Sequence, residues 1–170
     1  MTAGASLATK PGQEDGWLVT LDLTTQTVVY GTYVGGSGFD RIEGTAVDAS
    51  GTAYVWGETA ADGQFPVTPH ALQATPQGET DGFVTSVDAT GRIVYSTRLG
   101  GSAKEWWIHG AIDSHGDVYL TGYSGAVDSG YDPAWSSDFA FSPDAVATGV
   151  AVDIEHHTAR GFTVKLVPRA

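Results

Sequence analysis

The stretch DGFVTSVDATGRIVYSTRLGGS, residues 81–102, decides the fold, because most of it has already occurred once as DGWLVTLDLTTQTVVYGTYVGGS, residues 15–37. In each copy apolar and polar residues alternate on both sides of a short polar turn, and a Gly-Gly pair follows, which is the pattern of a β-hairpin. The offset from Asp15 to Asp81 differs by a single position from the offset between Gly35 and Gly100. This nearly constant spacing predicts a repeated structural unit.

A second hairpin is predicted after each copy. Residues 45–48 and 52–57 flank a DASG turn, and residues 110–113 and 118–122 flank the corresponding turn DSHG. An Asp that opens such a turn caps backbone N–H groups, and the Gly that closes it supplies a positive φ. We therefore interpret the recurring aspartates as turn formers and not as calcium ligands: Asp48, Asp88 and Asp113. Residues 39–44 and 102–109 are predicted to be loops, and the absence of any helical period predicts an all-β protein.

The chain divides at the copy boundaries into parts of a single module, residues 1–170. Residues 1–14 are the tail of a preceding connection, because SLATKPGQEDG (6–16) echoes ALQATPQGETDG (71–82). Residues 15–80 are the first repeat, 81–160 the second with a long insertion, and 161–170 the start of a third. The prolines at 66, 69 and 76 predict an extended path over the surface for residues 58–80, and the insertion contains an alternating stretch, 145–154, that predicts a further strand.

Composition narrows the range of partners. Twenty acidic residues against eight basic ones give a net charge of -12, which repels phosphate backbones and anionic lipids, so nucleic acid is not an expected partner. The chain has no Cys, which excludes disulfides and thiolate metal sites. No apolar run approaches the roughly 18 residues of a membrane span, and residues 1–15 lack the apolar centre of a signal peptide, so membrane insertion is not expected.

The duplicated hairpins, together with FPVTPHALQ at 65–73, resemble the bacterial β-propeller repeat family called SBBP. The resemblance implies four-stranded antiparallel blades, ordered from the axis outward. It implies residues 45–48 and 110–113 as innermost strands, 52–57 and 118–122 as second strands, 17–22 and 83–88 as third strands, and 28–34 and 93–99 as outermost strands. The chain then holds about two blades plus flanking strands, fewer than the four to eight of closed propellers. The resemblance further implies a secreted or cell-surface protein, either part of a longer propeller or completed by self-association through open blade edges.

In such a fold the irregular segments gather on one face, where binding usually occurs. The hypothetical ligand-binding residues on this loop face are Asp40, Arg41, Glu43, Lys104, Glu105, Trp106, Trp107 and His109. The adjacent Trp106 and Trp107 either stack on a sugar or grip a protein, or else one of them packs between blades and the other is partly exposed.

No metal or cofactor is predicted. His156 and His157 point to opposite sides of a strand, so they are unsuited to one ion even with Asp153 and Glu155 nearby. The spacing of three further acids matches no calcium loop: Asp128, Asp132 and Asp138. There is no G-x-S-x-G nucleophile motif.

We therefore expect a non-catalytic structural or protein-interaction module. The first alternative is a lectin-like propeller that binds a glycan through Trp106 and Trp107. The second is a hydrolase or lyase, in which carboxylates such as Glu43 and Glu105 face each other across neighbouring blades.

Overall fold

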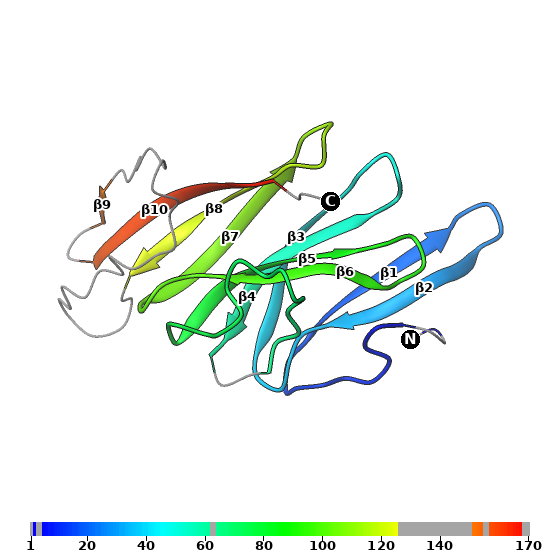
Figure 1. Ribbon diagram of the computed structural model, residues 1–170, viewed down its shortest axis with the longest axis horizontal. Helices are drawn as coiled ribbons and strands as arrows, with labels where there is room; N and C mark the ends of the chain where they lie inside the picture. Colours follow the sequence, from blue (N-terminus) through cyan, green and yellow to red (C-terminus); the bar gives the residue numbers. More distant parts are fainter. Residues whose placement is uncertain (1, 3–4, 62–63, 126–150, 155–156, 168–170) are drawn as a thin grey trace.

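The structure is a computed structural model that describes residues 2, 5–61, 64–125, 151–154 and 157–167, with the side chains of 151–160 left out of the description. The described residues form ten strands and no helix (Figure 1), which confirms the predicted all-β class. The strands are β1 (Gly16–Asp22), β2 (Thr27–Val34), β3 (Asp40–Val47), β4 (Ala53–Ala60), β5 (Thr80–Val87), β6 (Ile93–Leu99), β7 (Lys104–Ile112), β8 (Val118–Gly125), β9 (Ala151–Ile154) and β10 (His157–Leu166). With no helix in the described part of the chain, no helical segment there has the length and hydropathy to span a bilayer.

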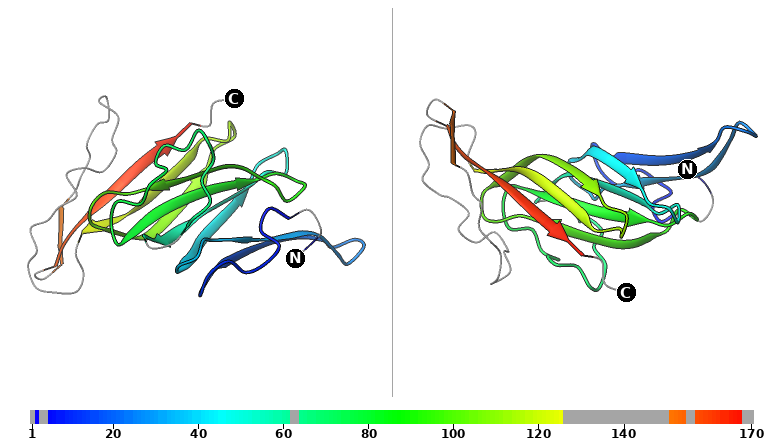
Figure 2. Two further views of the ribbon diagram at one scale, coloured as in Figure 1. Left: turned by 60° about the horizontal axis from the view of Figure 1, so that its bottom comes forward. Right: turned by 90° about the horizontal axis from the view of Figure 1, so that it is seen from above.

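The strands pair in three antiparallel sheets. The N-terminal hairpin is β1-β2, the central sheet has the order β3-β4-β5-β6, and the C-terminal sheet has the order β7-β8-β10-β9. The central sheet has the predicted order of four strands. None of the three sheets closes on itself within the described residues. They lie one after another along the molecule, with the central sheet in the middle (Figures 1 and 2).

The predicted turns are confirmed by repeated hydrogen bonds. Asp48 Oδ1 accepts the backbone N–H two residues later at 2.8 Å, and Asp88 and Asp113 do the same at 2.8 Å. The glycine that closes each turn has a φ between +82° and +87°, a backbone conformation in which a side chain would be strained. The aspartates are therefore turn formers, as predicted.

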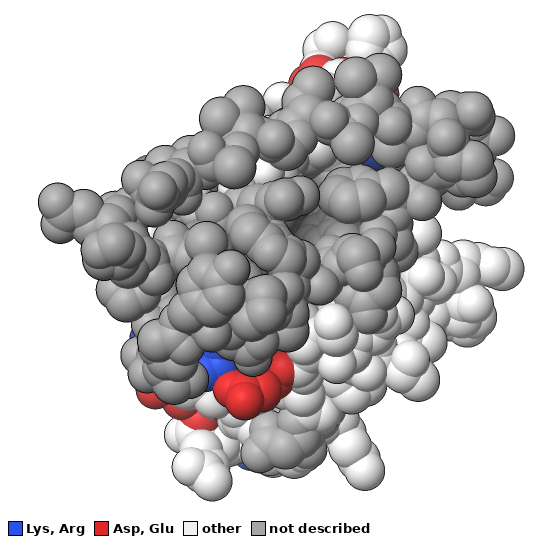
Figure 3. Space-filling model, turned by 90° about the vertical axis from the view of Figure 1, so that its left-hand side faces the viewer, with Lys and Arg blue, Asp and Glu red and all other residues white. Residues whose placement is uncertain are grey.

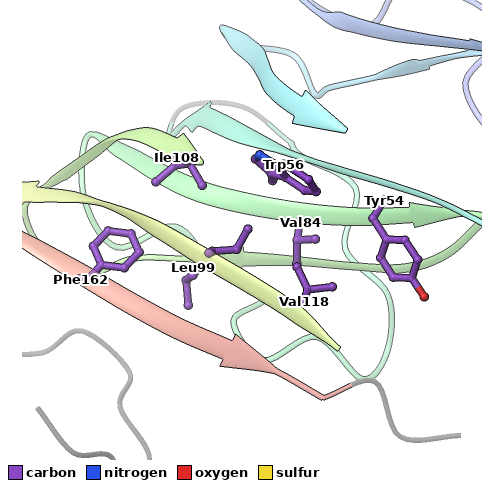
Figure 4. Close-up of a cluster of buried hydrophobic side chains, with 8 residues drawn as sticks. Tyr54, Trp56, Val84, Leu99, Ile108, Val118 and Phe162 are labelled. Carbon is purple, nitrogen blue, oxygen red and sulfur yellow. The ribbon is translucent and has the colours of Figure 1, made fainter. Parts of the chain in front are cut away.

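Two apolar clusters join the three sheets. The larger one lies between the central and the C-terminal sheets (Figure 4), and its buried members are Tyr54, Trp56, Val84, Leu99, Ile108, Val118, Leu120 and Phe162. The smaller one lies between the N-terminal hairpin and the central sheet, and its buried members are Val34, Val55, Phe65 and Phe83. Alternation within the strands explains this arrangement, because successive side chains of the central sheet point to opposite faces.

The connections that precede the two duplicated hairpins run along the outer strands in the same way. Tyr33 N donates to Leu7 O at 3.0 Å, and Arg98 N, at the equivalent position of the second copy, donates to Gln73 O at 3.2 Å. The outer edges of β2 and β6 are therefore covered by their own connections.

The prediction that residues 58–80 run over the surface was wrong in part. The first three of these residues belong to β4, and Phe65 and Gln73 are each only 5% exposed. The ring of Phe65 packs against that of Phe83 at 4.7 Å between centroids. An apolar residue directly before the first of the three prolines anchors the connection in the core.

The two predicted loops, residues 39–44 and 102–109, were also wrong. Most of these residues belong to β3 and β7. Each strand contains a β-bulge, formed by Glu43 in β3 and by Trp107 and Ile108 in β7. The antiparallel pairing continues on both sides of each bulge. Because a bulge interrupts the alternation of side chains locally, the sequence there looked irregular.

Candidate functional site

The eight residues predicted for a ligand-binding loop face lie on two strands, β3 and β7, and not on loops. These strands contact each other across the interface between the central and the C-terminal sheets. Two of the eight residues, Asp40 and Glu105, have buried side chains, and the other six have exposed or half-buried side chains. These six are Arg41, Glu43, Lys104, Trp106, Trp107 and His109.

Trp107 is the most unusual of these residues. Its φ is +54°, which is the left-handed region that bulky residues rarely adopt. Its indole is 54% exposed and meets the ring of Tyr123 edge-on, with 5.6 Å between centroids. The β7 bulge therefore presents a large aromatic surface to solvent at a cost in backbone strain.

The Glu58 carboxylate holds this bulge. Trp107 N donates a hydrogen bond of 2.6 Å to Glu58 Oε1, which joins β7 to β4 of the central sheet. Glu58 is only 7% exposed. Its burial raises the pKa of its carboxyl group, the hydrogen bond from Trp107 opposes that rise, and the neighbouring charge of Glu43 adds to it.

Glu58 and Tyr123 were missed when the site was predicted. The available signal for Glu58 was a charged residue directly after the apolar stretch AYVWG, because buried strands rarely include an unpaired charge. Trp106, the other predicted aromatic, is half-buried. Of the two alternatives given for this pair, the different exposures of Trp106 and Trp107 agree with the one in which only one indole is exposed.

Asp40 and Glu105 are structural. Asp40 Oδ2 accepts the N–H of Gly36 at 2.7 Å, and Glu105 Oε2 accepts the N–H of Gly101 at 3.1 Å. Glu105 also accepts a hydrogen bond of 2.6 Å from the Ser124 hydroxyl. In both copies the acid on the strand that follows the Gly-Gly pair, β3 or β7, thus accepts the backbone N–H of the second glycine.

Each of these acids lies beside a second buried acid from the duplicated hairpin. A Cβ on Gly35 would contact the carboxylates of both Asp15 and Asp40, and a Cβ on Gly100 would contact those of Asp81 and Glu105. The glycines are needed because they leave room for two carboxylates. Burial raises the pKa of Asp40, and the neighbouring Asp15 adds to the rise.

The two acid pairs differ in their counterions. Asp81 lies 3.4 Å from Arg98 Nη1 and accepts a hydrogen bond of 3.3 Å from Gln73 Nε2. In the first copy the positions of Arg98 and Gln73 are occupied by Tyr33 and Leu7. Asp15 has the partly exposed Lys10 at 3.9 Å instead. The charge of Arg98 also lowers the pKa of Asp40, so this guanidinium acts on the first pair as well, although its ion pair is with Asp81.

The structure gives Glu43 and Glu105 different surroundings. Glu105 is fully buried against Gly101 and Ser124, whereas Glu43 lies 3.9 Å from the Arg41 guanidinium. The charge of Glu43 raises the pKa of the neighbouring Glu58 carboxyl group.

The described part of the end of the C-terminal sheet carries both acidic and basic groups (Figure 3). On the described part of the face in Figure 3, acidic and basic groups touch each other and do not form a patch of one sign. One ion pair near the start of β7 joins Lys104 Nζ to Glu79 Oε2 at 2.9 Å.

No three His, Asp or Glu side chains are arranged for a metal ion among the residues that the structure describes. The acids considered for calcium, Asp128, Asp132 and Asp138, lie outside the described residues, as do Glu155 and His156. Asp153 and His157 belong to β9 and β10, but their side chains are not described.

No protein-family model matches the sequence, and no curated protein matches it. The resemblance to the SBBP repeat therefore stays a prediction from the residues that carry it.

Proposed function

We propose that this protein is a non-catalytic structural and protein-interaction module of the β-propeller repeat type, and that it binds partners through the N-terminal hairpin. The resemblance of the duplicated hairpins supports an extracellular or cell-surface setting. One observation carries the proposal: the exposure of Trp17.

Trp17 occupies the position that Phe83 has in β5 and Phe162 has in β10. Phe83 is 0% exposed and Phe162 is 6% exposed, because each packs on the sheet that precedes its own. Trp17 is 64% exposed, and Leu21 on the same side of β1 is 57% exposed. A side chain of this size in solvent marks a surface that a further sheet would cover.

The edge of β1 supports the same proposal. Within the described residues, β2 is the only strand in the same sheet as β1, so the backbone groups of Gly16–Asp22 on the other edge have no strand partner. In the central sheet the corresponding strand, β5, has β4 on that edge. An unpaired strand edge beside an apolar face is suited to strand addition.

The proposal is tested with a synthetic hairpin, a peptide of residues 104–125 that carries the sequences of β7 and β8. In the C-terminal sheet Phe162 lies opposite Gly122 of β8, so the peptide offers a glycine to Trp17. We expect the peptide to protect the backbone amides of β1 from hydrogen–deuterium exchange. The control is a Gly122→Val peptide, since a Cβ at Gly122 would lie 2.9 Å from the Phe162 ring. The same Cβ would lie 2.7 Å from Ile108 Cδ1 within the peptide, so circular dichroism must show that both peptides form the hairpin. Equal protection by both peptides, or by neither, would contradict the proposal.

A second candidate function is carbohydrate binding at Trp107. The exposed indole, its strained backbone and the Glu58 clamp form a pre-organised aromatic platform with polar neighbours. A glycan array tests it, with Trp107→Ala as the loss variant and Trp17→Ala as the exposed-indole control. Binding that survives Trp107→Ala would rule out this site.

A further inference from the structure

We infer that the partner of the N-terminal hairpin is a second copy of this chain, which accepts β1 and β2 beside its own β8. This inference rests on the proposed function and names the partner. The resulting sheet would have the order β7-β8-β1-β2, with the first two strands from one copy and the last two from the other.

The strand that now lies beside β8 has nearly the sequence of β1. GFTVKL at 161–166 in β10 aligns with GWLVTL at 16–21 in β1, so that aromatic, Val and Leu residues recur in the same phase. In the observed register Phe162 lies opposite Gly122, and Lys165 lies opposite Tyr119. The same register places Trp17 opposite Gly122 and Thr20 opposite Tyr119.

β10 pairs with β8 along the whole of β8, from Val118 to Gly125, so it is the outer edge of this sheet, beyond β10, that is incomplete. β9 pairs with β10 at four positions, from His157 to Arg160, so residues 161–166 of β10 have no strand on their outer edge among the described residues. β1 pairs with β2 along its whole length, from Gly16 to Asp22. If β1 and β2 replaced β10 and β9, the C-terminal sheet would consist of four long strands, as the central sheet does.

Val47 gives independent support for a second copy. It is 62% exposed at the end of β3, whereas its counterpart in the second copy of the repeat, Ile112 of β7, packs against the larger apolar cluster. Ile112 is covered because the central sheet has inner strands beside it, and Val47 is exposed because the N-terminal hairpin has none among the described residues. The β7 and β8 strands of a second chain, joined to β1, would cover Val47.

The exchange has identifiable costs. β10 leaves its place, which exposes Phe162 and breaks the ion pair between Lys165 and Asp117. Two copies with a net charge of -12 each also repel one another. Salt screens this repulsion, with a Debye length of about 8 Å at 0.15 M, so the association should strengthen as ionic strength rises. Because each copy gives one hairpin and accepts one, the contact joins copies head to tail.

The register is tested by disulfide cross-linking, which has no background because the natural chain has no Cys. A Thr20→Cys variant is mixed with a Tyr119→Cys variant under mild oxidation. Opposite residues of antiparallel strands have Cα atoms about 4.5–5.5 Å apart, within the range of a disulfide. We expect a linked dimer from this mixture that forms much faster than one from Ser50→Cys with Tyr119→Cys, in which the first position is an exposed turn. Equal rates would overturn the assigned register.

The partner is tested by sedimentation velocity at increasing protein and salt concentrations. We expect concentration-dependent dimers and larger species that Trp17→Lys and Val47→Lys each reduce by at least tenfold in affinity. Val94→Lys is the matched control, because Val94 is 53% exposed on β6, away from this surface. A protein that stays monomeric at high salt would overturn the inference. If the hairpin peptide still protects β1 in that case, the proposed function stands with a different partner; if it does not, both fail.

Discussion

Arg98 and Asp81 meet in the interior of the protein, 3.4 Å apart, with side chains that are 1% and 0% exposed. The Arg98 guanidinium also donates to Ala60 O at 3.3 Å and lies 5.6 Å from the centroid of the Phe65 ring. The pair thus connects β6, β5, the end of β4 and the following connection. In the other copy Tyr33 stands in place of Arg98, so this contact is particular to the central sheet.

Replacing Arg98 alone should be strongly destabilising. Arg98→Met keeps most of the side-chain volume but leaves the Asp81 carboxylate buried without its counterion, which costs about 3 kcal/mol of unfolding free energy. Urea denaturation measures the loss. The double variant Arg98→Met with Asp81→Asn should recover much of it, because the unpaired charge is gone. A double variant no more stable than the single one would show that the charge is not the cause.

The buried acid Asp40 should make stability depend on pH. Burial raises its pKa above the usual 3.8, so the folded state binds the proton more tightly than the unfolded state, and stability decreases as pH rises through this range. Asp40→Asn removes the titration and keeps an oxygen for the Gly36 N–H. In thermal unfolding, the melting temperature of the variant relative to that of the natural protein should increase from about pH 3 to about pH 7.

Asp48→Asn is the control of opposite sign. The Ser50 hydroxyl lowers the pKa of Asp48 through a hydrogen bond, so the ionised carboxylate stabilises the folded state at neutral pH, and this contribution is lost as pH decreases. The variant should therefore be less stable than the natural protein at about pH 7, and the difference should shrink as pH falls below the usual pKa of 3.8. Parallel pH profiles for the two variants would contradict both assignments.

The framework of strands was predictable because it depends on local chemistry that the sequence repeats. The nearly constant offset between the two copies and the turns opened by Asp48, Asp88 and Asp113 placed the hairpins correctly, and the alternation of apolar residues placed their faces. These signals are short-range, so they survive without knowledge of the tertiary structure.

The candidate site was less predictable because it depends on contacts between distant segments. Asp40 and Glu105 looked like exposed loop acids, and their burial follows from the backbone amides of the Gly-Gly turns. Glu58 acquires its role only when β7 packs beside β4. The recurrence of an acid at the same distance after the first glycine of both Gly-Gly pairs, Gly35 and Gly100, was a signal of this structural role.

Because of the backbone strain at Trp107, a glycine at this position should be more stable than an alanine, which is the reverse of the usual order in a β-strand. At a φ of +54° glycine has no Cβ to clash with the backbone, whereas alanine does. Trp107→Gly and Trp107→Ala remove the same contact with Tyr123, so their difference isolates the backbone. We expect the glycine variant to be more stable by about 1 kcal/mol in urea unfolding. An alanine variant that is equal or better would mean that the left-handed conformation is absent in solution.

Two glycines with the same backbone conformation test how the N-terminal hairpin is held on the central sheet. Gly91 and Gly51 have φ values of +87° and +86°, so Ala at either position should cost about 1 kcal/mol through backbone strain. A Cβ at Gly91 would also lie 3.0 Å from the Tyr30 ring of β2, whereas at Gly51 its nearest neighbour is the Ala89 methyl at 3.6 Å. Tyr30 is only 3% exposed and has little room to move.

Gly91→Ala should therefore cost at least about 1 kcal/mol more than Gly51→Ala, since overpacking adds to the strain. Urea unfolding measures both variants, and hydrogen exchange of β2 should rise in the first alone. Adding Tyr30→Ala should abolish the excess cost, because the clash partner is then removed. If the excess persists in that double variant, the contact between Tyr30 and the turn at Gly91 does not hold the hairpin in place.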